Sequence, residues 1–308
     1  MKVYNPRAAG VAAEQQARTR LRIEISVLGQ NRRGLPKLLD HNESEGWVVT
    51  EYFPGGTLED HLLNFAGNAF LSLTAFRSLV ETVAALHTDS IFHRDIKPAN
   101  IFISHDGMLL LGDFGIAFLP NLPERPTFTN ESVGPRDYMP PWAETEERLE
   151  KVEGQFDVYE LGKVLWCMAA GRLKLIREWH KRQDFDLRAK FQNDPHMHMV
   201  NAILDKCLNE DPEKVLSHAG LLLIEVDAHL RVMRRGGQML REGVPRPCRV
   251  CGQGFYQPAG GTSGQVLGLA TYVDIQGTPP GRRQDGGGLY AGFFVCDSCG
   301  NMQLFMTR

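Results

Sequence analysis

The chain has 308 residues, 43% of them hydrophobic, which suits two domains or one large domain with an appendage. Its net charge of −3 excludes the broad basic field typical of proteins that bind nucleic acid through charge alone. No apolar run approaches the roughly 20 residues of a membrane span, and the N-terminus has no signal-peptide core, so we expect a cytoplasmic protein without a membrane partner.

The first half of the chain predicts short strands between helices. Apolar residues on one face indicate a helix over 14–28, and the β-branched and aromatic run "WVVTEYF" (47–53) indicates a strand. Apolar residues recur at helical spacing over 74–88, and "MLLLGDFG" (108–115) is typical of a short buried strand that ends in glycine. Residues 119–142 contain six prolines and no periodicity, which predicts a functional loop.

The second half predicts helices followed by a β-rich end. Helical patterns cover 157–170, which stop at Gly171, and return at 197–208 and 215–233. The run "RRGGQMLREGVPRP" (234–247) breaks the pattern and indicates a linker. Beyond it the chain is rich in glycine and contains the β-type runs "QVLGLATYVDI" and "LYAGFFV".

Two motifs in the middle of the chain carry chemistry. "FHRDIKPANIFIS" (92–104), here called the catalytic loop, is followed by "GDFG" (112–115). A carboxylate beside a cation can orient a hydroxyl and accept its proton, and an Asn with a second Asp offers the oxygen ligands that Mg²⁺ prefers. A lysine supplies a point charge for a phosphate. Together these groups are suited to moving a phosphoryl group.

The two motifs resemble the catalytic loop and the magnesium motif of eukaryotic-type serine/threonine protein kinases. The similarity extends over residues 1–233, where "WVVTEYFPGGTL" resembles the hinge, "EISVLGQ" the regulatory helix of the N-lobe and "DVYELGKVLW" the central helix of the C-lobe. The resemblance implies an α+β kinase-like fold with an incomplete N-lobe (1–52), a mainly helical C-lobe (53–233), a linker (234–247) and a small β-rich domain (248–308).

The resemblance also implies a role for each matching residue. Asp95 would accept the substrate proton, Lys97 would contact the γ-phosphate, and Asn100 and Asp113 would hold Mg²⁺. ATP would meet the backbone of Glu51 and Phe53 beside the gatekeeper Thr50, with Phe102 as the floor of the adenine pocket. Asp157 would hold the loop backbone and His93 would be structural, while Arg94 would meet a phosphate on Thr127, Thr129 or Ser132.

The chain departs from the family where the activation segment ends. The run "GPRDYMPPW" (134–142) has Pro135 where the family has a bracing threonine, and Trp142 where it has a glutamate. The arginine that pairs with that glutamate is Val215 here. Since both charges are replaced together, we expect Trp142 to pack near Val215, although Glu144 could instead supply the carboxylate.

The family lysine that grips the phosphates corresponds to Lys2, which precedes the regulatory-helix residue Glu24 by 22 positions. Glu24 shares a helix face with Leu21 and Leu28, so it should point inward and require a cation. The two strands and the glycine-rich loop that the family places before this lysine have no counterpart in the sequence. We therefore expect weak ATP binding and poor turnover from this chain alone, with the missing strands supplied by upstream sequence or by a partner.

Four of the six cysteines form two Cys-x-x-Cys pairs, each followed by glycine, at Cys248, Cys251, Cys296 and Cys299. Four thiolates at this spacing suit tetrahedral Zn²⁺, and the segment resembles a zinc ribbon. A redox pair is disfavoured because the required βαβ setting is absent, and disulfides are disfavoured inside a cell. For the ribbon we favour a structural role or a docking partner over nucleic acid.

The leading hypothesis is therefore an enzyme that uses ATP and Mg²⁺ to phosphorylate serine or threonine in protein substrates, and that carries a zinc ribbon. A kinase-like scaffold without catalysis is the alternative, and a nucleic-acid-binding protein directed by the ribbon is a third. Asp95, Lys97, Asn100 and Asp113 are all present, which favours catalysis over the scaffold.

Overall fold

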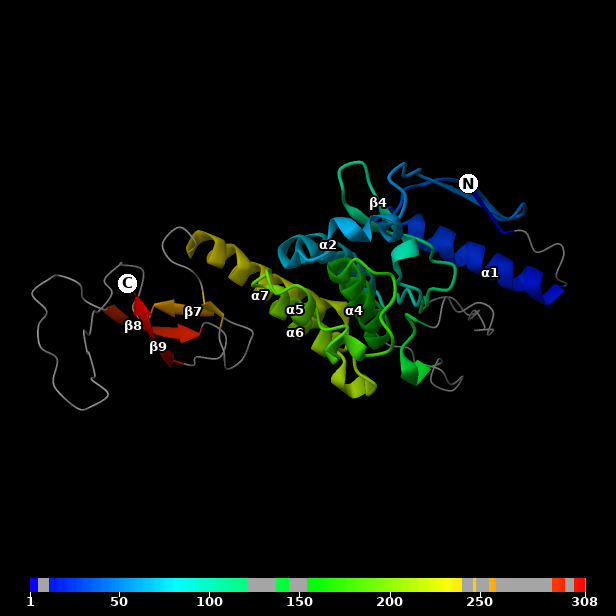
Figure 1. Ribbon diagram of the computed structural model, residues 1–308. Helices are drawn as coiled ribbons and strands as arrows, with labels where there is room; N and C mark the ends of the chain where they lie inside the picture. Colours follow the sequence, from blue (N-terminus) through cyan, green and yellow to red (C-terminus); the bar gives the residue numbers. More distant parts are fainter. Residues whose placement is uncertain are drawn as a thin grey trace, which may run out of the picture. The chain divides into compact units, whose positions relative to one another are not determined.

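The computed structural model describes residues 1–4, 11–120, 137–143, 154–239, 246–247, 255–258, 290–296 and 302–307. Contacts divide the chain into two compact units, Met1–Leu230 and Arg231–Arg308 (Figure 1), each of which is described by itself.

The first unit begins with a small antiparallel sheet covered by one helix. Its strands are β1 (Lys2–Val3), β2 (Leu38–Asn42) and β3 (Trp47–Thr50), in the order β1-β3-β2. Lys2 lies opposite Val48, so the short first strand is held in register by the central strand. The helix α1 (Val11–Leu28) packs on β2 and β3 and buries an apolar face that includes Leu21, Ile23, Val27 and Leu28.

The larger part of this unit is helical. Its helices are α2 (Ala69–Thr88), α4 (Gly154–Ala170), α5 (Leu187–Lys190), α6 (Met197–Cys207) and the first part of α7 (Ala219–Met239), which continues into the second unit from Arg231. Apolar residues cover nearly the whole circumference of α4, which explains why it lies buried against both α2 and α6. Gly171 ends α4 with φ 65°, as its position in the sequence predicted.

A hairpin carries the central motifs between the sheet and the helices. Strands β4 (Ile101–Ile103) and β5 (Leu109–Leu111) pair antiparallel with Phe102 opposite Leu110, and Gly107 takes φ 80° in the turn between them. The catalytic loop (92–104) includes β4, and the "GDFG" motif follows β5. Pairing of the two strands therefore brings the ends of the two motifs together.

The helix α2 is long and apolar enough to satisfy the criteria for a membrane span, although the sequence analysis found no such run. Part of this helix lies in the core of the unit, with zero exposure at Leu73, Phe76, Leu79 and Val83, whereas Phe70 and Leu71 near its start are exposed. Packing against α4 and β5 accounts for the buried part of this hydropathy.

The second unit contains a four-stranded antiparallel sheet in the order β6-β7-β8-β9. Its strands are β6 (Arg246–Pro247), β7 (Phe255–Pro258), β8 (Tyr290–Cys296) and β9 (Met302–Thr307). The predicted β-run "LYAGFFV" is confirmed as β8, whereas "QVLGLATYVDI" lies outside the described residues.

Most predicted elements are present with shifted ends, and one prediction is wrong. The predicted strand 47–53 ends at Thr50, and the helix predicted over 215–233 begins at Ala219. The linker predicted over 234–247 is helical in its first six residues, because α7 continues to Met239. Gly236 and Gly237 each weaken a helix by about 1 kcal/mol, but a helix that is already formed gains one hydrogen bond for every residue added.

Candidate active site

The backbone of the catalytic loop is held by a carboxylate of α4. Asp157 is fully buried, and it accepts the N–H of His93 at 2.8 Å and the N–H of Arg94 at 2.9 Å. His87 donates to the same carboxylate at 2.9 Å through Nε2, because its Nδ1 accepts the N–H of Ala219. Burial opposes the charge of Asp157, but these hydrogen bonds lower its pKa below the ordinary value. The hydrogen bonds predicted for Asp157 are confirmed.

Two residues of the motifs adopt a backbone conformation that is rare outside glycine. The angle φ is 67° at Arg94 and 62° at Asp113, in the left-handed region. Such conformations cost on the order of 1–3 kcal/mol and persist where the surroundings fix them, often at functional sites. Each motif therefore contains one such residue, and outside the motifs Asn31, Ser90 and Arg177 adopt the same conformation.

The side chain of Asp95 is fixed from two sides. Its two oxygens accept hydrogen bonds from Nζ of Lys97 at 2.9 and 2.8 Å, and Nδ2 of Asn100 donates to Oδ2 at 2.8 Å. The side chain of Asp95 remains 18% exposed, so a hydroxyl can approach it. A carboxylate that is oriented by a cation and still accessible is suited to accept a proton from a bound alcohol.

Lys2 lies in the same site, although it is 111 residues from Asp113 in the chain. Its Nζ is 2.8 Å from Oε2 of Glu24 and 2.7 Å from Oδ1 of Asp113. Burial opposes the charge of Lys2, but the carboxylates of Glu24 and Asp113 outweigh it and raise the pKa of the ammonium above its usual value. Glu24 is 4% exposed, so the predicted inward direction and the ion pair with Lys2 are both confirmed.

Histidine and phenylalanine side chains join the two motifs beneath the site. His93 is fully buried, accepts the N–H of Asp95 through Nδ1 at 3.2 Å, and bonds the carbonyl of Gly112 through Nε2 at 3.0 Å. Its ring meets Phe114 edge to face at 4.6 Å. The structural role predicted for His93, which is packing under the "DFG" turn, is confirmed.

An apolar wall lies beside these charged groups. The rings of Phe53 and Phe102 stack at 5.3 Å between centroids, and Gly112 approaches so closely that an added Cβ would lie 2.6 Å from the ring of Phe102. The N–H of Glu51 donates to the carbonyl of Lys37 at 3.0 Å. This arrangement agrees with a floor at Phe102, whereas contacts of adenine with Glu51 and Phe53 stay predictions.

The side chains that would hold Mg²⁺ present a suitable set of oxygens. Because Nδ2 of Asn100 donates to the carbonyl and the carboxylate of Asp95, its Oδ1 is left as an acceptor. The N–H of Gly112 donates to the carbonyl of Asn100 at 2.9 Å, which places Asn100 next to the residue that precedes Asp113. Within the described residues no three His, Cys, Asp or Glu side chains gather to hold a metal by themselves. These two residues therefore fit a cation that phosphate oxygens help to bind.

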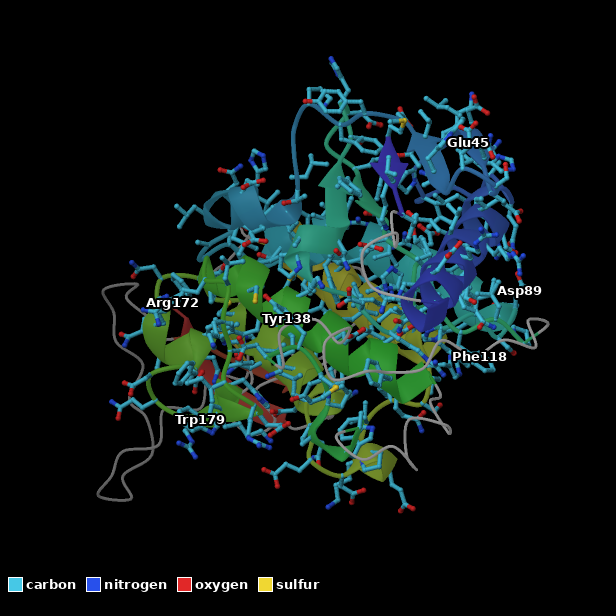
Figure 2. All side chains as sticks on the ribbon, turned by 90° about the vertical axis from the view of Figure 1, so that its right-hand side faces the viewer. Glu45, Asp89, Phe118, Tyr138, Arg172 and Trp179 are labelled. Carbon is cyan, nitrogen blue, oxygen red and sulfur yellow. The ribbon has the colours of Figure 1, made fainter. Side chains whose placement is uncertain are left out.

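The end of the activation segment packs on α4. Tyr138, labelled in Figure 2, places its hydroxyl 3.5 Å from Sγ of Cys167 and donates to the carbonyl of Leu173 at 2.6 Å. Trp142 meets Tyr159 edge to face at 5.3 Å, and Val215 is 5% exposed. The predicted proximity of Trp142 to Val215 stays a prediction.

Several predicted residues lie outside the described part of the chain. These are Pro135, Glu144, the candidate phosphosites Thr127, Thr129 and Ser132, and the cysteines Cys248, Cys251 and Cys299. Cys296 ends β8, but its side chain is not described.

Sequence reasoning missed two residues of the site. The hydroxyl of Tyr4 donates to Glu24, and Glu160 of α4 accepts the N–H of Ile96 at 2.8 Å. Both had a detectable pattern: Tyr4 follows Lys2 by two residues and so shares its face of the strand, and Glu160 follows Asp157 by three in an apolar helix.

Comparison with known proteins agrees with this geometry. The family model described as "Protein kinase domain" matches residues 12–224. The serine/threonine-protein kinase chk1 of Schizosaccharomyces pombe is 28% identical over 176 residues, which are 54% of this chain and 35% of the relative. The serine/threonine-protein kinase stk11 homolog of Dictyostelium discoideum is 35% identical over 144 residues, which are 44% of this chain and 24% of the relative. The mitogen-activated protein kinase kinase kinase 4 of Mus musculus is 30% identical over 196 residues, which are 58% of this chain and 12% of the relative. The chain spans about a third or less of the length of these relatives.

Proposed function

Because the chain belongs to the protein kinase family, we propose that it transfers the γ-phosphoryl group of ATP to serine or threonine hydroxyls of protein substrates. The observation that carries the proposal is the fixed carboxylate of Asp95, which Lys97 and Asn100 orient while leaving it accessible. In the reaction the bond between the γ-phosphorus and the β–γ bridging oxygen breaks, and a bond from the substrate oxygen to that phosphorus forms. Asp95 accepts the hydroxyl proton, and ADP leaves.

The cations of the site have separate tasks. Lys97, between Asp95 and the incoming phosphate, neutralises charge on the γ-phosphoryl group, and Lys2 binds the phosphates nearer the ribose. Glu24 keeps Lys2 in place through the ion pair at 2.8 Å. Asn100 and Asp113 would hold Mg²⁺, which neutralises phosphate charge when it is bound. Transfer therefore depends on positioning and charge rather than on a covalent intermediate.

Specificity for serine and threonine is supported by two observations. Lys97 stands two residues after the catalytic Asp95, which is the serine/threonine form of this loop, and the relatives named above carry serine/threonine kinase names or belong to a kinase cascade by name. Pro135 stands where the family has a threonine, in the segment that would meet the substrate, so this part of the site differs from the usual serine/threonine form.

A kinase-like scaffold is the competing function, and the assembled site favours catalysis. A scaffold has no need for a paired Lys2 and Glu24 or for an oriented Asp95, yet these side chains are held at 2.7–2.9 Å from their partners. Burial of Glu24 and strain at Asp113 cost stability, and groups held at such a cost cluster at functional sites, which supports catalysis.

The test compares transfer of labelled phosphate from ATP by the full chain and by three variants. Asp95→Asn should lose transfer and keep binding of Mg·ATP, whereas Asp113→Ala should lose both. Asp106→Asn serves as the matched control, because Asp106 is an exposed residue of the β4–β5 turn that bonds only locally with Ser104. Equal transfer by all four proteins would refute the roles given to Asp95 and Asp113. Mg·ATP binding without transfer in any of the four proteins would favour the scaffold.

We also propose that the second unit holds one Zn²⁺ through Cys248, Cys251, Cys296 and Cys299. The strand register supports this: Pro247 pairs with Phe255, and Tyr256 pairs with Cys296. Pro247, Phe255, Cys296 and Met302 therefore lie at the same end of the sheet, and the other three cysteines stand between these residues in the sequence. Four thiolates from two Cys-x-x-Cys pairs suit a structural zinc site, and the unit would then serve as a rigid docking surface for a partner protein.

A further inference from the structure

A second carboxyl group of α4 contacts the catalytic loop. Glu160 follows Asp157 by three residues, so the two side chains project from adjacent turns on one side of the helix. Glu160 is only 2% exposed, and its Oε2 accepts the N–H of Ile96 at 2.8 Å. Its contact lies two residues beyond the loop amides that Asp157 holds.

This contact acts on the peptide unit next to the proposed base. The N–H of Ile96 and the carbonyl of Asp95 belong to the same peptide plane, which is attached directly to Cα of Asp95. The N–H is held by Glu160, and the carbonyl accepts from Nδ2 of Asn100 at 2.9 Å. Because both polar ends of the plane are held, it cannot rotate about its bonds, and the direction of the Asp95 side chain is fixed from the backbone as well.

Two negatively charged side chains, Asp157 and Asp95, lie near Glu160 and affect its protonation. Burial, followed by the negative charges of Asp157 and Asp95, raises the pKa of the Glu160 carboxyl well above its ordinary value. A carboxyl group accepts a hydrogen bond through its carbonyl oxygen in the neutral form as well as in the charged form. The contact with Ile96 therefore does not depend on the charge of Glu160, and Lys97 is the cation that pairs with Asp95.

We propose that Glu160 is a positioning residue for phosphoryl transfer, which holds the Asp95–Ile96 peptide so that the carboxylate of Asp95 faces the substrate hydroxyl. The proposal rests on the proposed kinase function. The acceptor oxygen is what matters, since an apolar residue in its place would leave the buried N–H of Ile96 without a partner.

The experiment compares Glu160→Gln and Glu160→Met in the full chain. Gln keeps an acceptor oxygen of the same reach, whereas Met has a similar length and no comparable acceptor. Lys163→Met is the matched control: Lys163 is one turn further along α4, is 1% exposed, and donates to the carbonyls of Leu175 and Arg177, away from the catalytic loop. Phosphoryl transfer gives kcat and KM for ATP, and amide hydrogen exchange reports the protection of Ile96.

Glu160→Met is expected to increase exchange at the Ile96 amide and to lower kcat about tenfold, which corresponds to about 1.4 kcal/mol, with KM for ATP within about twofold. Glu160→Gln should stay within about threefold of the wild type in kcat. Lys163→Met should change Ile96 exchange no more than it changes exchange at core amides that open only on global unfolding, whereas Glu160→Met should increase Ile96 exchange beyond that level.

The proposal fails if Glu160→Met keeps wild-type kcat, or if Glu160→Gln loses as much as Glu160→Met. If the wild-type chain itself transfers no phosphate, the kinase proposal fails instead, and exchange still decides the role of Glu160. Ile96 protection that is equal in Glu160→Met and the wild type would then refute the contact.

Discussion

Asp157 offers the sharpest test of how the fold supports the site. Asp157→Asn keeps one carbonyl oxygen and replaces the other by an NH₂ donor. In the wild type, Oδ2 accepts from His93 N–H and His87 Nε2–H, and Oδ1 accepts from Arg94 N–H. If the amide oxygen takes the Oδ2 position, the NH₂ group faces the buried N–H of Arg94, which loses its acceptor. If the amide is turned the other way, the N–H groups of His93 and His87 lose their acceptor instead.

The expected cost follows from these contacts. An unpartnered buried N–H costs about 1–3 kcal/mol, and hydrogen bonds to a neutral acceptor are weaker than those to a carboxylate by about 1 kcal/mol each. The neutral Asn avoids the cost of burying the Asp157 charge, which offsets part of the loss in hydrogen bonding. We therefore expect Asp157→Asn to lower the free energy of unfolding of the first unit by about 3 kcal/mol. Looser catalytic-loop amides should lower phosphoryl transfer as well.

Urea unfolding followed by tryptophan fluorescence measures this change. The reporters all lie in the first unit, at Trp47, Trp142, Trp166 and Trp179. Asp205→Asn is the matched control, because Asp205 also bonds a histidine, His180 at 2.8 Å, but its side chain is 48% exposed. It should cost under about 1 kcal/mol. A loss in Asp157→Asn no larger than in Asp205→Asn would refute the role of Asp157 in holding the loop.

Three further predictions follow from other contacts. Burial lowers the pKa of Lys163 from 10.5 to about 8, so between these pH values the unfolded chain binds more protons than the folded chain. From pH 7 to 10.5, the unfolding free energy of the wild type should therefore rise by up to about 3 kcal/mol relative to that of Lys163→Met. A difference between the two proteins that stays constant with pH in urea unfolding would contradict this. Tyr4→Phe should weaken Mg·ATP binding about threefold, because the Tyr4 hydroxyl donates to Glu24 and holds it in place. The control Tyr52→Phe, at an exposed side chain, should leave Mg·ATP binding unchanged. Equal Mg·ATP affinity in Tyr4→Phe and the wild type would contradict this prediction. Metal analysis should find close to one zinc per chain, lost in Cys248→Ser and kept in Cys167→Ser, whose thiol is buried in α4; zinc that persists in Cys248→Ser would reject the site.

The sequence alone determined the local parts of this protein. The "HRDIKPAN" and "DFG" motifs selected Asp95, Lys97, Asn100 and Asp113 as candidate site residues, because the motifs resemble those of protein kinases and their groups suit proton transfer and phosphate neutralisation. Helical periodicity located α2, α4 and α6 to within a few residues. The ion pair of Lys2 with Glu24 was also predicted: the helix face of Glu24 called for a cation, and the resemblance to protein kinases gave Lys2 as that cation.

Only the tertiary structure decided which distant groups share these contacts. The spacing of Tyr4 and Glu160 from Lys2 and Asp157 does not identify their partners. The fold brings Tyr4 to Glu24, and the packing of α4 brings Glu160 to Ile96. The end of α7 shows the opposite case, in which glycines at 236 and 237 predicted a break but the hydrogen bonds of an established helix outweighed their low propensity. Propensity and motif are properties of neighbours in the chain, whereas burial, pKa and the direction of a carboxylate depend on neighbours in space.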